Sequence, residues 1–596
     1  MITYESTRTV HALVHNAAAE HKDRVFLQYE ENGEVFRVTY EQFAKECDAI
    51  AAWAREKRAE VGHKLKVGIL GVSSHHYLAV LLGVMSGGDT GIPLDVQLNA
   101  EKLADCLNRS DVDVLFYDWD FHPITEQVQD ACPNVTEYIS LQHGKHVNCS
   151  DKILKAYEGR QVESDAKAEE CAMILFTSGT TGRGKGVMLS NGNLMDNNFC
   201  TTDTNHPENE IYLNVLPIHH VFCLNGDVFT VMRYGGILCL NRDMKKLAEH
   251  ILLFEPTVIR MVPMMAKALY NRIAILNRQH PEIPVRKVKE QVLGTRLHKI
   301  ISGGGYLAPD LAANYQRLGI AIAQGYGMSE CSPKISSPDW TRPDKIASVG
   351  RIVDRCQVRI VDGEIQVKSP SVMMGYYKEP DKTAEAITPD GWLCTGDIGH
   401  VDEEGFLYLT GRKKNLIILS NGENVAPEEL ENLFEDERLI EDILVYGADD
   451  MICAEVYPNY KYAEAANITD IDGTVAQIIK KHNEELPTFK RILRSNIREI
   501  PFAKTSSKKI IRNQYLEGKK TEEQSEKNLR MPETELQKQI YECIAGVLGH
   551  RRFGIGTELY EAGLDSLGSV MLLTDLYQIL KISMTLDDLV QHASVL

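Results

Sequence analysis

The segment CAMILFTSGTTGRGKGVMLS, residues 171–190, constrains the fold more than any other part of the sequence. Its first residues, Cys171 to Phe176, predict a buried strand, which runs into a loop with four glycines, three threonines and one serine. Such a loop offers backbone N–H groups and hydroxyls to phosphate oxygens, and Lys185 adds a positive charge. We therefore predict a phosphate-binding loop at the end of a buried strand.

This loop differs from a Walker phosphate loop. The spacing from Gly179 to Gly184 and Lys185 nearly satisfies G-x-x-x-x-G-K-[ST], but Gly186 stands where the magnesium-binding hydroxyl would be. The residues that follow, VMLS, predict a strand, whereas a Walker loop opens a helix. A flexible surface turn is the alternative, and the density of glycines and hydroxyls disfavours it.

Apolar runs alternate with helical patterns up to about Thr410, which predicts parallel α/β layers. Short strands with glycine turns at residues 364–419 indicate a more antiparallel arrangement, and a smaller α+β unit follows to about Tyr515. A chain of 596 residues is too long for one core. We predict a multidomain protein with a large α/β part (residues 1–411), a small α+β part (412–515), a polar flexible linker (516–530) and a small all-α, four-helix domain (531–596).

Two patterns define the last of these parts. ETELQKQIYECIAGVLGH predicts an amphipathic helix with Leu536, Ile540, Ile544 and Leu548 on its apolar face. Near the end of the chain, GLDSL places Ser566 at the first turn of a short predicted helix. Taken alone, that serine is most simply a helix cap.

Composition excludes several classes of protein. A net charge of −19 argues against binding to nucleic acid or to an anionic membrane. The N-terminus has no signal-peptide pattern, and apolar runs such as LAVLLGVM are too short to span a bilayer. The 13 cysteines include no C-x-x-C pair, which favours reduced thiols and a soluble, cytoplasmic protein.

The ordered motifs TSGTTGRGKG, PIHHVF, QGYGMSE, GWLCTGDIG, GRKKNLIILSNGENVAPEELE and KTSSKKIIR resemble those of the adenylate-forming superfamily. That superfamily includes acyl-CoA synthetases, luciferases and the adenylation domains of nonribosomal peptide synthetases. The resemblance covers nearly all of residues 1–515 and implies a ligase. Its large and mobile small subdomains would be residues 1–411 and 412–515, and ATP and Mg²⁺ would be required.

The resemblance also implies roles for individual residues. Glu330 would hold magnesium, Tyr326 would stack on adenine, and Asp397 and Arg412 would contact the ribose. Taken singly, Glu330 and Asp397 could be solvated loop acids and Tyr326 a core aromatic. The remaining nucleotide-binding positions implied are Thr177, Ser178, Gly179, Thr180, Thr181, Gly182 and Lys185 at the phosphates, and Gly303, Gly304, Gly305, Gly327 and Ser329 around the base and the substrate carboxylate.

Three further residues would act in catalysis. Lys509 matches the family's catalytic lysine, Lys185 belongs to the phosphate loop, and His220 matches the P-x-x-H histidine, although His219 beside it leaves that assignment open. Lys414 matches the hinge about which the small subdomain rotates. One of the two states would present Lys509, and the other would present the strand near Gly422.

The chain departs from the family pattern at three of its motif positions. Lys508 replaces a glycine beside the catalytic lysine, which puts the first half-reaction in doubt. The milder changes are Gly184 for proline and Ser329 for threonine.

The GLDSL motif resembles the attachment site of acyl and peptidyl carrier proteins. Because it follows an adenylating enzyme and a linker, we expect Ser566 to carry 4′-phosphopantetheine, whose thiol is a far better acyl acceptor than a hydroxyl. The partners implied are a carboxylic acid, a phosphopantetheinyl transferase and a downstream assembly-line enzyme.

The substrate class is less constrained by sequence. Amino-acid-activating domains usually carry an Asp near the PIHHVF segment to bind the α-amine, but here the nearest acid is Asp227. We therefore favour a fatty or aryl acid. The alternatives are an acyl-CoA synthetase with a vestigial carrier, an amino-acid-activating didomain, and a non-catalytic nucleotide-binding scaffold.

Overall fold

The computed structural model divides into two compact units, residues 1–409 and 410–596, each of which is considered by itself. The residues described are 2–141, 148–177, 184–201, 209–419, 424–448, 451–504, 510–512, 515, 532, 534–548, and the positions 555, 559, 564, 569, 571–573, 576 and 589.

The first unit contains a seven-stranded sheet built around the strand that precedes the predicted phosphate loop. Its order is β19-β8-β7-β4-β3-β5-β6, and β7 through β6 are parallel while β8 and β19 are antiparallel additions. The strands are β3 (Lys66–Leu70), β4 (Thr90–Leu94), β5 (Val114–Tyr117), β6 (Glu137–Ser140), β7 (Cys171–Thr177), β8 (Lys185–Ser190) and β19 (Gly375–Tyr376). We call this the phosphate-side sheet. Both VMLS and the apolar run before the loop are strands, as the sequence predicts.

A second seven-stranded sheet has the order β13-β12-β11-β9-β10-β1-β2 and is parallel except for the β1–β2 hairpin. Its strands are β1 (Val25–Glu31), β2 (Glu34–Thr39), β9 (Ile211–Asn214), β10 (Ile237–Leu240), β11 (Val258–Met261), β12 (Lys299–Ser302) and β13 (Ala321–Gln324). We call this the acyl-side sheet. The predicted parallel α/β layers are therefore present, with antiparallel strands at one edge of each sheet.

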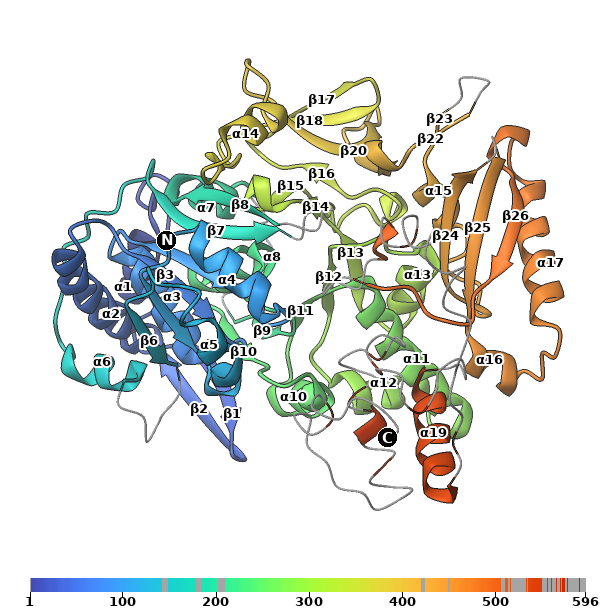
Figure 1. The fold of residues 1–596 in the computed structure, drawn as a ribbon, viewed down its shortest axis with the longest axis horizontal. Helices are drawn as coiled ribbons and strands as arrows, with labels where there is room; N and C mark the ends of the chain where they lie inside the picture. Colours follow the sequence, from blue (N-terminus) through green and yellow to red (C-terminus); the bar gives the residue numbers. More distant parts are fainter. Residues whose placement is uncertain are drawn as a thin grey trace. The chain divides into compact units, whose positions relative to one another are not determined.

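Helices complete these layers (Figure 1). Helices α1, α2 and α3 pack against one another, and Thr39 begins α2 with a reciprocal capping box to Gln42. No helix in the described part of the chain is long and apolar enough to cross a membrane. The helices of the first unit are α1 (Val10–His21), α2 (Tyr40–Val61), α3 (His75–Ser86), α4 (Ala100–Arg109), α5 (His122–Val128), α6 (Ser150–Ala156), α7 (Asn191–Asn198), α8 (Val221–Cys223), α9 (Thr230–Tyr234), α10 (Leu247–Phe254), α11 (Pro263–Gln279), α12 (Val285–Leu293), α13 (Pro309–Arg317) and α14 (Pro380–Ala386), with a π-helical segment over Leu224–Phe229.

Two smaller antiparallel sheets follow, and the second of them lies largely in the region, residues 364–419, that the sequence predicts to be more antiparallel. One is a three-stranded sheet of β14 (Tyr326–Gly327), β15 (Lys334–Ser337) and β16 (Arg351–Ile352). The other has the order β17 (Gln357–Val361), β18 (Glu364–Lys368), β20 (Leu393–Val401) and β21 (Leu407–Arg412). Alternate residues of β20 are buried, which turns Thr395 and Asp397 toward the same interior face.

The second unit begins as a small α+β structure. Its three-stranded sheet is β24 (Ile440–Ala448), β25 (Met451–Pro458) and β26 (Ile492–Ile497), accompanied by the short pair β22 (Ile417–Ile418) and β23 (Asn424–Val425). The helices are α15 (Pro427–Asn432), α16 (Tyr460–Ala465) and α17 (Ile471–Glu484), and α17 buries Val475 and Ile479.

Further along this unit, α19 (Glu535–Leu548) confirms the predicted amphipathic helix but corrects its apolar face. Ile544 is buried, whereas Leu536 is 55% exposed. Ile540 packs against the same separate apolar cluster as Ile544, and this cluster also includes Tyr541, Cys543, Ala545, Ile555, Leu559, Leu564, Leu572, Leu576 and Leu589. Leu536 stays outside because this cluster contacts the later turns of the helix.

All 13 cysteines are free thiols, and ten of them are buried. This arrangement is consistent with the reduced thiols that the sequence predicts.

Candidate functional site

The predicted site segments follow the carboxyl ends of parallel strands in both sheets. The loop after Thr177 leaves β7, and Asp95 follows the neighbouring strand β4. On the acyl-side sheet, the segments PIHHVF, SGGGY and GYGMSE follow β9, β12 and β13. Ligands of open α/β sheets bind outside the carboxyl ends of the strands. In both sheets, therefore, the predicted motifs lie where such a ligand would bind.

The two ends of the phosphate loop are held together. Thr177 and Lys185 are paired residues of the β7–β8 hairpin. Arg109 Nη1 donates to the carbonyl of Gly184 at 2.7 Å, and a Cβ on Gly184 would lie 2.5 Å from the Thr177 carbonyl oxygen. Glycine therefore suits this conformation, where the family usually has proline. Ser178, Gly179, Thr180, Thr181 and Gly182 lie outside the described residues.

Tyr376 connects the loop lysine with the predicted magnesium residue. It lies on β19, where it pairs with Val187 of β8, the strand that begins at Lys185. Lys185 Nζ is 4.5 Å from the Tyr376 ring centroid, and the Tyr376 hydroxyl donates to Glu330 Oε1 at 2.9 Å. Burial and the Glu330 carboxylate raise the pKa of Tyr376, so the phenol remains a donor at neutral pH.

A second tyrosine connects the predicted adenine and ribose positions. Tyr326 is buried, and its hydroxyl donates to Asp397 Oδ2 at 2.6 Å. Burial raises the pKa of Tyr326, and the Asp397 carboxylate raises it further. Although 71 residues separate them in sequence, the two residues that the family resemblance assigns to the nucleoside are in direct contact.

The hairpin that carries Glu330 is positioned by one buried amide. Asn197, on α7, donates to the carbonyls of Cys331 at 2.8 Å and Lys334 at 3.0 Å, and its Oδ1 accepts from the Lys334 N–H at 3.1 Å. Ser190 caps the start of helix α7, and its side chain forms a capping box with Asn193. Gly327 allows the turn to close, because a Cβ there would lie 2.1 Å from the Pro333 carbonyl oxygen. Ser329 and Glu330 fall in the short 3₁₀ turn between the hairpin strands.

The glycines after β12 approach the PIHHVF segment. A Cβ on Gly303 would lie 2.7 Å from the Phe222 ring, so only glycine permits this contact. Gly304 has φ of +76° and, like Gly305, is exposed. The sequence therefore brings SGGGY and PIHHVF together, as expected for segments that line one substrate.

The two adjacent histidines differ in environment. His219 is buried with Nε2 3.9 Å from Asp95 Oδ1, whereas His220 is exposed and precedes α8. Burial lowers the pKa of His219, and the neighbouring His220 lowers it further. The exposed ring, His220, is the one open to a ligand, which favours the P-x-x-H assignment.

In the second unit, Arg412 precedes a short 3₁₀ turn (Lys413–Asn415) that contains Lys414, and the Arg412 N–H donates to Glu428 at 3.4 Å. The segment carrying the predicted catalytic lysine is bound on both sides. Lys504 pairs with Asp442 at 2.8 Å and forms a β-bridge with Ile510, and Arg512 pairs with Glu431. Lys508, Lys509, Gly422 and Ser566 themselves lie outside the described residues.

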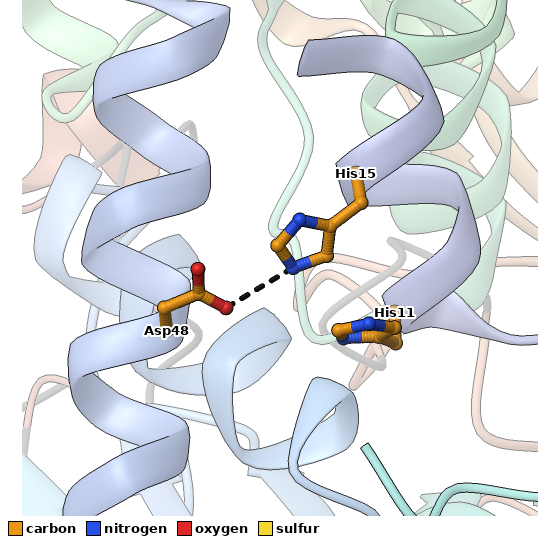
Figure 2. A group of neighbouring side chains, drawn as sticks. All are labelled: His11, His15 and Asp48. Carbon is orange, nitrogen blue, oxygen red and sulfur yellow. Dashed lines mark hydrogen bonds and ion pairs between the residues drawn. The ribbon is translucent and has the colours of Figure 1, made fainter. Parts of the chain in front are cut away.

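Among the described residues, one group of side chains has metal-ligating composition (Figure 2). His11 and His15 lie one turn apart on α1, and His15 Nε2 is 3.0 Å from Asp48 Oδ1 on α2. Burial and the neighbouring His15 lower the pKa of His11 to about 4. No predicted site residue lies on either helix, so we interpret the cluster as an interhelix contact.

Sequence reasoning missed three residues that organise this site: Tyr376, Asn197 and Asp95. None lies in the motifs that carry the family resemblance. Only the three-dimensional structure reveals these residues. Tyr376 reaches the loop because β19 pairs with β8, and Asn197 reaches the Glu330 hairpin from helix α7.

Three family matches follow one another along the chain. Residues 14–377 match the AMP-binding enzyme family, residues 414–522 its C-terminal domain, and residues 538–596 the phosphopantetheine attachment site. Long-chain-fatty-acid–CoA ligase FadD15 of Mycobacterium bovis is 28% identical over 488 residues, covering 74% of this chain and 80% of that protein. A long-chain-fatty-acid–CoA ligase of Escherichia coli is 25% identical over 538 residues, covering 80% and 92%.

Solved structures share the fold. The anthranilate CoA ligase AuaEII in complex with anthranoyl-AMP has a TM-score of 0.72 at 17% identity, covering 87% of this chain and 99% of that one. ATP-bound MatB from Rhodopseudomonas palustris has a TM-score of 0.72 at 20% identity, covering 86% and 99%.

The fold and the family matches define an adenylate-forming acid–thiol ligase with an attached carrier region. The chain belongs to the AMP-binding enzyme family.

Proposed function

We propose that this protein activates a carboxylic acid with ATP and loads it onto the phosphopantetheine thiol of its own carrier region, at Ser566. The observation that carries the proposal is the order of the three family matches, because an attachment site follows a complete adenylating enzyme in one chain. The loaded acyl group would then pass to a downstream biosynthetic enzyme.

In the first half-reaction a substrate carboxylate oxygen attacks the α-phosphorus of ATP. A carboxylate–phosphorus bond forms, the α–β phosphoanhydride bond breaks, and pyrophosphate leaves. The protein's task is to position the reactants and to neutralise charge. In our assignment the loop from Thr177 to Lys185 binds the β- and γ-phosphates, and Lys509 stabilises charge at the α-phosphate.

The nucleoside is assigned to Tyr326, Asp397 and Arg412, and the glycines 303–305 border the base and the substrate carboxylate. Asp397 accepts a hydrogen bond from Tyr326, so the carboxylate assigned to the ribose is held beside the tyrosine assigned to adenine. His220 is assigned to the phosphates and the acyl group.

Glu330 fits the requirements of a magnesium ligand. Its carboxylate is buried, one oxygen is oriented by Tyr376, and within the described part of the chain it makes no ion pair. Mg²⁺ prefers carboxylate oxygens, and bound there it would neutralise phosphate charge. A structure of o-succinylbenzoate CoA synthetase contains both ATP and magnesium.

In the second half-reaction the phosphopantetheine thiolate attacks the acyl carbon, a thioester forms, and AMP leaves with the former carboxylate oxygen. We assign Lys414 as the hinge between the two orientations of the small subdomain. A thiolate is the appropriate nucleophile because it attacks acyl groups far better than a hydroxyl near neutral pH.

For the substrate we propose a fatty or aryl acid without an α-amino group. Asp227, the acid nearest the segment where amino-acid-activating domains bind the amine, pairs with Arg260 at 2.6 Å and is buried. It is therefore already neutralised. The activities named for similar proteins, on long-chain fatty acids and anthranilate, support the same class.

The deciding experiment is intact-protein mass spectrometry. A phosphopantetheinyl transferase and CoA should add one prosthetic group to the wild-type chain, and ATP, Mg²⁺ and the correct acid should then add a hydroxylamine-labile acyl group. Ser566→Ala should abolish both additions and leave ATP–pyrophosphate exchange unchanged. If Ser566 only caps a helix, the variant should lose about 1 kcal/mol of stability and still be loaded.

A CoA ligase with a vestigial carrier is the second candidate, favoured by the fatty-acid–CoA ligases among the similar proteins. It predicts acyl-CoA as the only thioester. After free CoA is removed from the phosphopantetheinylated protein, acyl transfer to the chain itself distinguishes the two functions.

A further inference from the structure

The contact between α1 and α2 contains more ligating groups than an interhelix contact needs. Figure 2 shows His11 and His15 one turn apart on α1 and Asp48 on the neighbouring helix α2. The spacing i, i+4 is the one at which two histidines on one face of a helix bind zinc. One ring nitrogen of each histidine and one oxygen of Asp48 all lie within 4.8 Å of one another.

A histidine and a carboxylate are enough to join two segments of this protein. His63 pairs with Asp113 at 2.9 Å, and within the described part of the chain no third histidine, cysteine or carboxylate completes a metal-ligating group there. His15 and Asp48, 3.0 Å apart, form the same kind of pair. His11 is the additional residue. Its ring lies 4.1 Å from the His15 ring, between centroids, and makes no hydrogen bond among the described residues.

The three side chains are close to the arrangement that a zinc ion requires. Two imidazoles and one carboxylate are a ligand set that Zn²⁺ accepts, with water in the fourth position. Bonds of about 2.1 Å in a tetrahedron place the ligand atoms about 3.4 Å apart, and His15 Nε2 already lies 3.0 Å from Asp48 Oδ1. Asp48 is buried, whereas His11 and His15 are half-buried, so small rotations of the two rings complete the site.

The protonation of these residues is compatible with a bound cation. Burial and the neighbouring His15 lower the pKa of His11 to about 4, so its ring is neutral at pH 7 and offers a nitrogen lone pair. His15 would bind the ion through the nitrogen that now bonds Asp48. One proton then stays on the other ring nitrogen, and any second proton is released to solvent.

We propose that His11, His15 and Asp48 form a binding site for Zn²⁺. Because the ligands come from two helices, the bound ion cross-links α1 to α2 and strengthens the contact that the His15–Asp48 hydrogen bond makes without it. The site is separate from Glu330, the residue assigned to magnesium, and takes no part in the proposed reaction.

The test is calorimetric titration of the full chain with Zn²⁺, after bound metal has been removed with a chelator and without ATP or Mg²⁺. The wild-type protein should bind one zinc ion more than His11→Gln and one more than His15→Gln. His63→Gln is the matched control, because it removes a histidine of a two-residue pair and should bind as many ions as the wild type. Zn²⁺ should also raise the Tm of the wild type more than that of His11→Gln.

Two further measurements separate this site from other causes. Co²⁺ bound here should give d–d absorption without the thiolate charge-transfer bands that cysteine ligands produce, and His11→Gln should lose this absorption. His11→Gln keeps the hydrogen bond between His15 and Asp48, so its Tm in chelator should equal that of the wild type and show that it is folded. No zinc bound to the wild type, or an unchanged zinc count in His11→Gln, would overturn the inference. Either result leaves the proposed function standing, because that function uses none of these residues.

Discussion

The two seven-stranded sheets of the first unit are similar in construction and differ in how their sites are encoded. On the phosphate-side sheet, one continuous segment supplies a strand, a loop and the returning strand, from Cys171 to Ser190. On the acyl-side sheet, the motifs come from separate segments, because PIHHVF follows β9, SGGGY follows β12 and GYGMSE follows β13. The phosphate loop is thus encoded locally, whereas only the fold brings the motifs of the acyl side together.

The largest expected effect concerns the buried charge of the acyl side. Asp227→Ala should lower the free energy of unfolding by about 3–5 kcal/mol, because it leaves Arg260 buried without its carboxylate. Urea denaturation measures it. The control is Asp344→Ala, which removes an exposed partner of Arg342 and should lower it by less than about 1 kcal/mol. Equal losses of stability in the two variants would show that the buried Asp227–Arg260 pair contributes no more than an exposed pair.

The next effect tests whether the first step is independent of acid selection. Lys509→Ala should slow adenylation on the order of a hundredfold or more, by the same factor for every acid, because it removes charge stabilisation at the α-phosphate. Transfer from supplied acyl adenylate should be retained. Lys508→Ala is the matched control in ATP–pyrophosphate exchange. If Lys508→Ala slowed exchange and Lys509→Ala did not, Lys508 would be the lysine that acts at the α-phosphate.

A smaller effect tests the phosphate side. Tyr376→Phe removes the hydroxyl that orients Glu330 but keeps the ring beside Lys185. The Mg²⁺ concentration for half-maximal exchange should rise about tenfold, as for other lost partners of metal ligands. Tyr377→Phe is the control, because its hydroxyl donates to Asp111 instead. An altered ranking of acids in Tyr376→Phe would contradict the division between the two sheets.

The smallest effect lies on helices that carry no residue assigned to the reaction. In the metal-free protein, His15→Ala should lower the free energy of unfolding by about 1 kcal/mol, since it removes the hydrogen bond to Asp48. His11→Ala keeps that bond and should have less effect. Thermal denaturation measures both. A change in kcat for either variant would contradict this interpretation and show that the His11–His15–Asp48 cluster affects the reaction.

The same division explains what the sequence could predict. The strand, loop and strand of residues 171–190 follow from local apolar and glycine patterns, and so do the parallel layers. Tyr376 could not be found, because its relation to Lys185 depends on a strand pairing nearly 190 residues along the chain. The apolar face of α19 was misjudged at Leu536, since spacing alone does not determine which turns meet the core.

The hairpin held by Asn197 has a consequence for how this enzyme can diversify. All three of its hydrogen bonds go to backbone atoms of Cys331 and Lys334, so the position of Glu330 does not depend on the side chain at 334. A mutation at codon 334 can therefore change this side chain without moving Glu330, the proposed magnesium ligand, four residues away. This hairpin can therefore vary in sequence at position 334 while its backbone geometry is inherited unchanged.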